Sequence, residues 1–456
     1  MGTVAAREAK MRTLLFMRMN PVAGHEYSPH YRPGGSDAAN SLRILFTAIG
    51  APMNPKTHSL AAALIAGLPL AAGATTGPAI SGLVATADGA ETAAKNPAGL
   101  TRLDRAEWVG GVRVFYADSE SDTTLDGGPS LSDDSSTTLF IPAVYYARPL
   151  NEDITLGISL TVPSGLGSDP GNETAGRYLL DKWSLGYVSL APAVGYRVNE
   201  KFSVGATVNF NYAVYDYESA VFNGIGEPDG TMKLSASDFG IGFQLGLLYE
   251  FTPTTRIGLN YRSSSTSDFS DTPELSGLTP EREAGLEDGI RSKKFSLESK
   301  FPQALVAGIY HQFPDGKSAT VDVAWVDFSQ YGLTSAVVGD TSIEVQDKKY
   351  DDIWAVSAGF SWPLDDRWTM RVGAAYASAG IDDQNRSFAF RLDRVVGAGV
   401  GAQYQWDKDR LVGVNLTYYD LGDGRVDQDI PLVGTLSSEY SSNYALGLDF
   451  SIRWLR

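Results

Sequence analysis

Residues capable of chemistry are few in this sequence. The chain of 456 residues has no cysteine, which excludes disulfides, iron–sulfur clusters, cysteine-ligated zinc and thiol nucleophiles. It has four histidines, and His311 alone follows residue 74. Catalytic triads and catalytic metal sites need a histidine with defined partners, and the sequence offers none around His311. We therefore predict that the protein is not an enzyme and holds no cofactor or metal, and that His311 is a polar residue of the lumen or beside a turn.

Charge and hydropathy exclude two further classes. The net charge of −17 argues against nucleic acid as a partner, because phosphate backbones attract basic surfaces. Beyond the N-terminal region there is no apolar run of eighteen residues, so a multi-helix membrane protein is excluded. Glycine and aromatic residues are abundant, with 48 Gly, 22 Tyr, 19 Phe and 8 Trp. These proportions suit a large β structure.

The N-terminal region differs from the rest of the chain. Residues 1–52 are basic and show no strand or helix periodicity, so we interpret them as an upstream extension of the reading frame. A real N-terminal segment with its own role is the alternative. Residues 53–74 have the features of a signal peptide: Lys56, an apolar core over 60–70 and a small-residue cleavage site at its end. We expect the mature chain to begin at Thr75.

From Trp108 onward, apolar and polar residues alternate. In 239–251, seven apolar residues occupy every second position, with Gly, Gln and Glu among the residues between them and Leu248 as the single exception. This period places one face of a strand in an apolar medium and the other in a polar one. The pattern predicts fourteen strands: 108–116, 139–147, 154–163, 183–197, 202–215, 237–251, 256–263, 295–313, 318–331, 351–363, 368–377, 391–406, 410–420 and 439–454.

Strand lengths and connections separate a membrane barrel from a soluble sandwich. Many of these strands exceed the usual five or six residues of soluble sheets. Six tight turns alternate with seven long connections, as an up-and-down barrel with both chain ends on one side requires. Aromatic residues recur beside the turns, for example Trp362, Trp368 and Trp406, as in an interfacial girdle. We predict an all-β fold: a 14-stranded antiparallel transmembrane β-barrel, closed because lipid offers no partner to an open edge.

Residues 75–107 do not alternate and contain too little apolar material to fold alone. They include Asn96-Pro97-Ala98, followed by the first strand. In this position the motif resembles the hatch motif of the FadL/TodX family of outer-membrane hydrophobic-compound transporters. The likeness continues along most of the chain, in Gly246-Leu247-Leu248-Tyr249-Glu250, Tyr261-Arg262-Ser263, Trp368-Thr369, Gln384-Asn385-Arg386-Ser387 and Asp393-Arg394. The resemblance implies that residues 75–107 form a hatch that plugs a barrel spanning 108–456.

The resemblance also implies a mechanism. Members of the family carry long-chain fatty acids or hydrocarbons across the outer membrane, from an extracellular groove to a pocket beside the hatch and out sideways at a kinked third strand. Here the third strand ends in Val162-Pro163-Ser164-Gly165; proline removes a ladder donor and glycine tolerates distortion. Gly157, Val162, Pro163 and Gly165 are therefore candidates for a lateral gap. The alternative is that Pro163 only ends the strand.

Two further sets of ligand-binding candidates follow. A cluster of apolar residues in an otherwise polar loop suggests a ligand groove, or else loop self-packing: Leu166, Tyr178, Leu179, Leu180 and Trp183. Arg386 and Arg394 are candidates for pairing with a ligand carboxylate, because guanidinium binds carboxylate in a bidentate manner. The alternative for both is an ion pair within the lumen or loops, for Arg386 with Asp382, Asp383 or Asp393.

We thus expect a bacterial outer-membrane transporter for passive uptake of hydrophobic compounds, foremost long-chain fatty acids. The expected partners are the ligand, membrane lipid and lipopolysaccharide, and the expected state is a monomer. Aromatic hydrocarbons are the alternative substrate. A general or cation-selective porin is the rival function, because residues 117–138 carry six acidic residues and no basic one; a solvated surface bridged to lipopolysaccharide by divalent cations is the plainer interpretation. A structural or adhesion barrel is third. The chain departs from the family in a short segment before Asn96 and in Leu455-Arg456 after the final aromatic residue.

Overall fold

The computed structural model describes residues 80–125, 128, 131–168, 181–286, 294–338, 341–343, 350–383, 385–386, 393–430 and 434–456. The predicted extension 1–52, the signal peptide 53–74 and the expected start at Thr75 lie outside the described residues. Among the described residues, no helix has the length and apolar content needed to cross a membrane.

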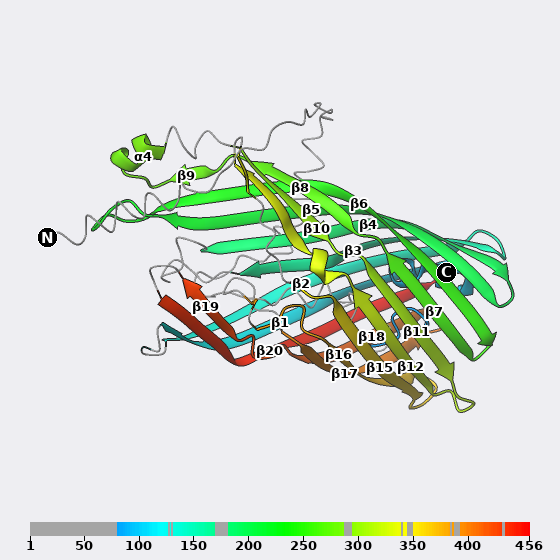
Figure 1. Cartoon of the computed structure of the whole chain (residues 1–456). Coiled ribbons are helices and arrows are strands. Elements are labelled where there is room, and N and C mark those ends of the chain that lie inside the picture. Colours follow the sequence, from blue (N-terminus) through cyan, green and yellow to red (C-terminus); the bar gives the residue numbers. More distant parts are fainter. Residues whose placement is uncertain are drawn as a thin grey trace, which may run out of the picture. The chain divides into compact units, whose positions relative to one another are not determined.

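The main sheet closes on itself. Of its sixteen strands, fourteen follow one another around a circuit that the pairing of β1 with β20 completes, while β9 attaches to β6 and β19 to β20 (Figure 1). All pairings are antiparallel. The barrel strands are β1 (Glu107–Leu125), β2 (Leu131–Pro149), β3 (Ile154–Ser168), β4 (Lys182–Asn199), β5 (Phe202–Val221), β6 (Gly230–Thr252), β7 (Thr255–Arg262), β11 (Ala304–Gln312), β12 (Ser318–Val326), β15 (Ile353–Pro363), β16 (Trp368–Ala377), β17 (Val395–Asp407), β18 (Arg410–Asp420) and β20 (Gly434–Leu455).

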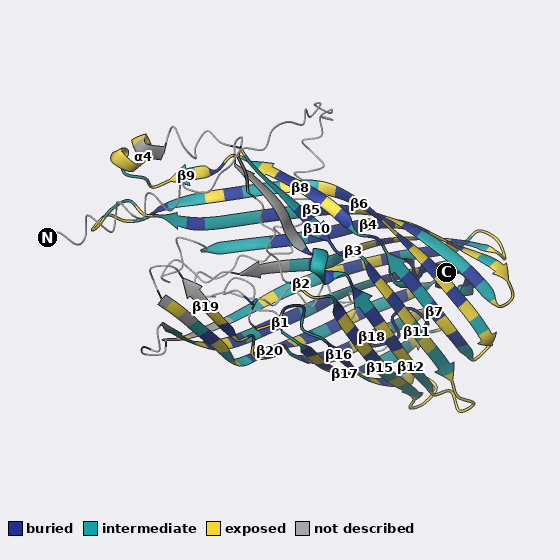
Figure 2. Cartoon of the chain, viewed as in Figure 1, coloured by how far each residue is buried: buried dark blue, intermediate teal, exposed yellow. Residues whose placement is uncertain are grey.

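The predicted closed barrel of fourteen strands is therefore confirmed. The alternation that predicted it is also the pattern of burial along the strands, as Figure 2 shows. On β6, Phe239, Ile241, Phe243, Leu245 and Leu247 are exposed, whereas Gly240, Gly242, Gln244 and Gly246 between them are buried. Each of the fourteen barrel strands contributes at least one exposed large apolar side chain. The apolar face points outward and the polar, glycine-rich face points into the barrel.

Three predicted features are corrected. The strand expected over 295–313 is two strands: β10 (Phe295–Phe301) pairs with β8 and β13, and β11 alone joins the barrel. Pro302 lies at the break, where its missing N–H cannot extend a ladder. The expected long loops 117–138 and 216–236 are mostly strand, because β1–β2 and β5–β6 continue pairing to Thr123–Leu131 and Val221–Gly230. The third corrected feature is the expected long loop 421–438, which contains strand residues of β19 and β20.

Two of the remaining elements precede β1, and the others lie in the connections between barrel strands. A second sheet has the order β14-β13-β10-β8. These elements are α3 (Thr92–Lys95), η3 (Pro97–Arg102), β8 (Ser265–Asp271), β9 (Glu274–Ser276), α4 (Pro280–Leu286), η5 (Phe328–Gln330), β13 (Gly332–Val338), β14 (Thr341–Ile343) and β19 (Val426–Ile430).

An ion pair bridges the seam where the first and last strands meet. Arg113 of β1 and Asp449 of β20 are direct neighbours in the ladder, and both are buried. Arg113 Nε donates to Asp449 Oδ1 at 2.6 Å and Nη2 donates to Oδ2 at 3.0 Å, a bidentate arrangement. Because the two groups satisfy each other away from water, losing one of them leaves an uncompensated buried charge.

We predict that Asp449→Ala lowers the free energy of unfolding by about 3–5 kcal/mol, as expected when one partner of a buried pair is removed. Urea unfolding of the barrel in lipid vesicles, followed by tryptophan fluorescence, measures the loss. The matched control is Asp407→Ala, which breaks the exposed pair with Arg410 and should barely move the unfolding midpoint. Equal effects in the two variants would contradict a special role for the seam pair.

Candidate functional site

The segment before β1 packs against the inner face of the barrel. We call its described part, residues 80–106, the hatch segment. Asn96 is buried and uses both ends of its amide: Nδ2 donates to Val84 O at 2.8 Å and to Leu247 O of β6 at 3.0 Å, while Oδ1 accepts from Ala98 N at 3.2 Å. Asn96 thereby caps η3, which starts at Pro97, a favourable first helical residue. The Asn96-Pro97-Ala98 motif joins two parts of the hatch segment to the wall.

Glycines on the wall let the hatch segment approach this closely. A Cβ added at Gly205 of β5 would lie 2.3 Å from Pro97 C, and one at Gly246 of β6 would lie 2.1 Å from Asn96 Oδ1. At Gly157 of β3 a Cβ would lie 2.9 Å from Ala93 Cβ. Distances below 3 Å are clashes, so any larger residue would have to displace the segment. The inward glycines of the alternating pattern are thus the seat of the hatch segment.

Charged side chains of the wall hold the hatch backbone. Arg256 of β7 donates from Nε to Ala85 O at 2.6 Å, and Arg453 of β20 donates from Nη1 to Asp88 O and from Nη2 to the Glu91 carboxylate at 2.9 Å. Asp322 of β12 accepts from Gly82 N at 2.7 Å and from Leu83 N at 3.1 Å. Arg197 of β4 donates to Thr101 O. These strands lie far apart around the circuit, so the segment is fastened on several sides rather than hinged on one.

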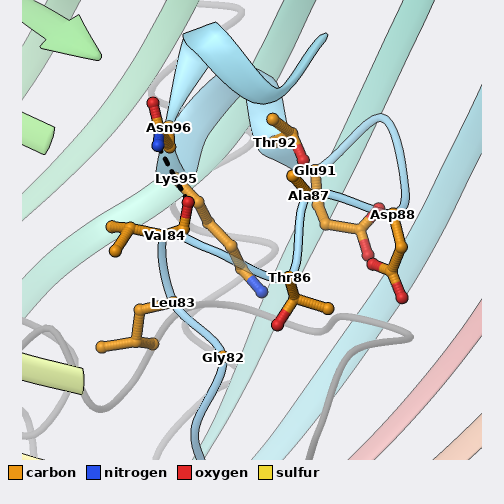
Figure 3. A pocket seen from close by; sticks show the side chains of 10 residues that line it. All are labelled: Gly82, Leu83, Val84, Thr86, Ala87, Asp88, Glu91, Thr92, Lys95 and Asn96. Carbon is orange, nitrogen blue, oxygen red and sulfur yellow. Dashed lines mark hydrogen bonds between the residues drawn. The ribbon is translucent and has the colours of Figure 1, made fainter. Parts of the chain in front are cut away.

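A small polar pocket lies within the hatch segment itself (Figure 3). Its lining includes the side chains of Asp88, Glu91 and Lys95, and Lys95 extends from the end of α3 toward the loop that carries Thr86. Carboxylates and an ammonium group make a surface that favours water over hydrocarbon. This pocket is no site for an apolar ligand.

Pairing between β2 and β3 is incomplete. Within the described parts of both strands, the ladder runs from Pro149–Thr155 to Val144–Leu160 and stops there. On its other edge, β3 has a register shift against β4 between Thr161 and Ser164, which leaves Val162 and Pro163 out of the ladder. Gly165 pairs again, with Gly186, and Gly157 lies at the hatch segment. The predicted lateral-gap residues therefore lie in two places. Val162 and Pro163 form the irregularity and Gly165 lies beside it, whereas Gly157 lies against the hatch segment.

Above the hatch segment the wall is apolar in two connected clusters, which we call the apolar lining. One contains Phe115, Val326, Phe328, Tyr331, Ile353 and Tyr419 with the hatch residues Ile80, Leu83 and Val84. The other contains Leu185, Tyr187, Ala213, Tyr215, Phe269 and Phe301. Trp183, a predicted groove residue, is half-buried and packs against both. Of the other groove residues, Tyr178, Leu179 and Leu180 lie outside the described residues, as does the side chain of Leu166.

Arg262 at the end of β7 places two guanidinium nitrogens without hydrogen-bond partners among the described residues beside this lining. Its Nε and Nη2 atoms are buried and have no hydrogen-bond partner among the described residues. Its Cζ lies 4.6 Å from the centre of the Phe301 ring, a cation–π contact. Its ladder neighbour Gln244 donates to Asn209 Oδ1 at 3.0 Å and accepts from Asn260 Nδ2 at 3.1 Å. An amide band and a free guanidinium thus adjoin an apolar surface, an arrangement complementary to an amphiphile.

Arg386 and Arg394, the predicted candidates for this role, are already engaged. Arg386 is buried, pairs with Asp383 at 2.5 Å and Asp393 at 3.6 Å, and donates to Arg425 O at 2.8 Å. It fastens the loop after β16 to the loop after β18, where a hydrogen bond to Asp393 raises the pKa of Asp423. Arg394 is half-exposed and pairs with Asp420 at 3.2 Å. Of the two alternatives left open by the sequence, the ion pair matches this geometry.

Arg262, Phe328 and Tyr331 received no role from the sequence. Arg262 occupies an inward position of a predicted strand, and no acidic residue is adjacent to it in the sequence. These two features are the signal by which the sequence could have indicated a guanidinium without an acidic partner. Phe328 and Tyr331 were placed inside a predicted strand that ends earlier, at Val326. His311 lies beside a tight turn, where its Nδ1 is 2.8 Å from Thr255 Oγ1.

Taken together, these features define a class of protein: a closed antiparallel barrel with an apolar exterior, an N-terminal segment packed against its inner wall, and an apolar lining beside that segment. A barrel of this kind belongs in an outer membrane.

Comparison with known proteins identifies the family. The family described as outer membrane protein transport protein (OMPP1/FadL/TodX) matches residues 57–453. The long-chain fatty acid transport protein of Escherichia coli K12 is 25% identical over 377 residues, which cover 75% of this chain and 84% of that protein. A Pseudomonas aeruginosa FadL homologue matches in structure with a TM-score of 0.71 at 19% identity, covering 84% of this chain and 97% of that one. The Pseudomonas putida toluene transporter TodX matches at 0.60 and 18% identity, covering 81% and 94%.

The chain belongs to the FadL/TodX family, and the resemblance seen in the sequence is confirmed. It is an outer-membrane transporter of hydrophobic compounds in a Gram-negative-type envelope.

We predict that Gly205→Ala displaces the hatch segment, because its Cβ would overlap the backbone at Pro97 and Ala98. Loosening of the block should appear as ion conductance in planar bilayers and as faster proteolysis before β1. Gly110→Ala is the control, since an added Cβ there meets only Trp454, at 3.8 Å. If Gly205→Ala barrels conduct no more ions than the natural protein, the segment does not block the bore.

Proposed function

We propose that this protein takes up long-chain fatty acids passively: the ligand enters the apolar lining from outside, stops above the hatch segment, and leaves sideways between β2 and β3 into the membrane. Apolar solutes gain nothing from a water-filled bore, because burial away from water is what favours them. A lining that leads to the membrane interior keeps the ligand out of water at every stage.

The observation that carries this proposal is the coincidence of two features at β3. The ladder to β2 ends at Leu160, and the ladder to β4 is disturbed at Val162 and Pro163. Unpaired backbone is costly in lipid, so a barrel keeps such an edge only where something compensates it. Because Arg256, Asp322 and Arg453 fasten the hatch segment across the bore, the wall at β3 is the less obstructed exit.

The preference for a fatty acid over a hydrocarbon rests on Arg262. A carboxylate would satisfy its free donors through charge-assisted hydrogen bonds, while the alkyl chain packs on the apolar lining. Toluene and similar compounds offer no acceptor and would leave the guanidinium unpaired. Aromatic hydrocarbon transport is the second candidate, favoured by the many aromatic rings of the lining, including Phe269, Phe301 and Tyr187.

A general porin needs an open bore, and the hatch segment argues against it. We also propose that the protein works as a monomer in contact with lipid and lipopolysaccharide. Exposed apolar side chains on every barrel strand support lipid contact all round the circuit.

We predict that Pro163→Val with Gly165→Val reduces uptake of a labelled long-chain fatty acid, because both changes favour regular pairing of β3. Uptake is measured in cells that make this barrel and in cells that lack the gene. Pro192→Val on β4 is the control, a lipid-facing proline paired with Ile158 and clear of the irregularity. Undiminished uptake with a folded barrel would remove the proposed exit; absence of uptake by the natural protein would remove the function itself.

We further predict that Arg262→Met lowers fatty-acid uptake about tenfold, since a hydrogen bond to a charged group is worth about 1.5–3 kcal/mol. Uptake of labelled toluene by the same cells should not change. Arg394→Gln, which removes a half-exposed guanidinium, is the control for charge alone. If Arg262→Met spares fatty-acid uptake while the natural protein transports toluene, the hydrocarbon alternative is correct.

A further inference from the structure

A short aromatic turn after β12 presents two stacked rings to the interior. The turn is η5, and both Phe328 and Tyr331 are 4% exposed. Their ring centres are 4.8 Å apart with an interplanar angle of 15°, and the Phe328 ring lies 5.7 Å from that of Tyr350. Stacked rings form a broad, stiff surface, because each side chain has few rotatable bonds.

Hydrogen bonds hold this turn in place from two directions. Asp327 N donates to Gln303 O at 3.0 Å, and Gln303 Nε2 donates back to Asp327 Oδ2 at 2.8 Å. Asp352 accepts from Trp325 Nε1 at 2.9 Å and from Ser329 N at 3.4 Å. The aromatic pair is therefore carried by a fixed support rather than by a loose loop.

The Tyr331 side chain approaches Ser164 of β3. β12 is the ninth strand of the circuit and β3 the third, so this contact spans the interior. Ser164 is buried and is the first β3 residue to pair with β4 after the irregularity at Val162 and Pro163. The ring of Tyr331 thus ends at the disturbed part of the wall.

The same apolar cluster reaches the other side of the break. Leu139 and Ile141 of β2 pack against the cluster that contains Phe328 and Tyr331. Both lie beyond Val144, on the stretch of β2 that has lost β3 as a partner. The cluster that contains Tyr331 therefore reaches β2 beyond the point where its ladder with β3 ends.

We propose that Tyr331 is the residue that controls passage from the apolar lining to the break between β2 and β3, and that its ring sets the width of ligand that passes. This inference rests on the proposed lateral exit. A ligand leaving by that route has to move Tyr331 away from Ser164. A bulky, ring-bearing fatty acid requires a larger displacement than a linear one, so the residue determines specificity by width.

The absence of natural cysteines makes a cross-linking test clean. A direct disulfide between positions 164 and 331 is unsuitable, because a tyrosine and a serine side chain that meet end to end hold their Cα atoms farther apart than the about 7 Å that a disulfide tolerates. The double variant Ser164→Cys, Tyr331→Cys is instead bridged with a short, reducible bis-methanethiosulfonate. The control pair is Val323→Cys, Val356→Cys, lipid-facing ladder neighbours on β12 and β15 that do not span the break.

We expect the 164–331 bridge to abolish most fatty-acid uptake and a reducing agent to restore it, while the 323–356 bridge leaves uptake nearly unchanged. Full uptake through the bridged 164–331 barrel would overturn the proposal, and so would equal inhibition by both bridges. Absence of uptake by the natural chain would instead refute the proposed function, so the two failures are distinguishable.

Substitution at the ring gives an independent measurement. Tyr331→Ala should raise uptake of a ring-bearing fatty acid relative to a linear one, whereas Tyr331→Phe, which keeps the ring, should retain the natural ratio. Urea unfolding verifies that both variants are folded. An unchanged ratio in a folded Tyr331→Ala barrel would contradict control by width.

Discussion

The structure depends on one constraint: inside a bilayer, backbone donors and acceptors have no water to bond to, so each must find a partner in the protein. The seam between β1 and β20 satisfies this requirement along nearly their whole length, from Glu107–Leu455 to Leu125–Leu436. Once this ladder closes, the first and last strands leave no open edge, and the alternation of side chains decides the rest. Apolar residues face lipid, and the bore receives whatever occupies the other positions.

The same alternation explains how a bore of this size becomes blocked. Small residues at inward positions leave room, and the hatch segment fills it with backbone rather than with large side chains. Backbone brings polar groups that must be satisfied, which accounts for the ring of wall partners that includes Arg256, Asp322 and Arg453. Asn96 fits for the same reason. Its amide donates to the carbonyl oxygens of Val84 and Leu247 and accepts from the N–H of Ala98. Small inward residues thus account both for the filled bore and for the polar contacts that hold the hatch segment.

Sequence pattern predicted the barrel well where one face meets lipid, and poorly beyond the membrane. The seven exposed residues of 239–251 are recognisable because lipid demands an uninterrupted apolar face. Farther along β1, Asp118 and Asp122 occupy the outward positions while Ser119 and Ser121 are buried, so the apolar period disappears although pairing continues to Thr123–Leu131. The division of 295–313 at Pro302 failed to appear because the flanking strands keep similar composition while joining different sheets.

The site was predictable only in part, for a related reason. Asn96-Pro97-Ala98 and Pro163 are visible in sequence because proline and its neighbours restrict the backbone locally. Arg386 lies in a loop with acids close by in the sequence, whereas Arg262 ends a strand with no acid next to it, but this local difference does not determine which guanidinium is engaged. That distinction depends on which acids fold to within reach: Asp383 and Asp393 for Arg386, and none among the described residues for Arg262.

An unpaired guanidinium beside apolar rings is costly to maintain, because a buried charge without a partner loses its hydration. The stacking on Phe301 recovers a part of that cost, and the amides of Gln244 and Asn260 lie close by. A protein under selection for stability alone would place an acid or an apolar residue there. Retaining the free donors makes physical sense if an anionic group arrives with the ligand, because the same interaction that is missing in the empty barrel then becomes the source of binding. The proposed preference for a carboxylate ligand thus follows from the cost of leaving the Arg262 donors unsatisfied in the empty barrel.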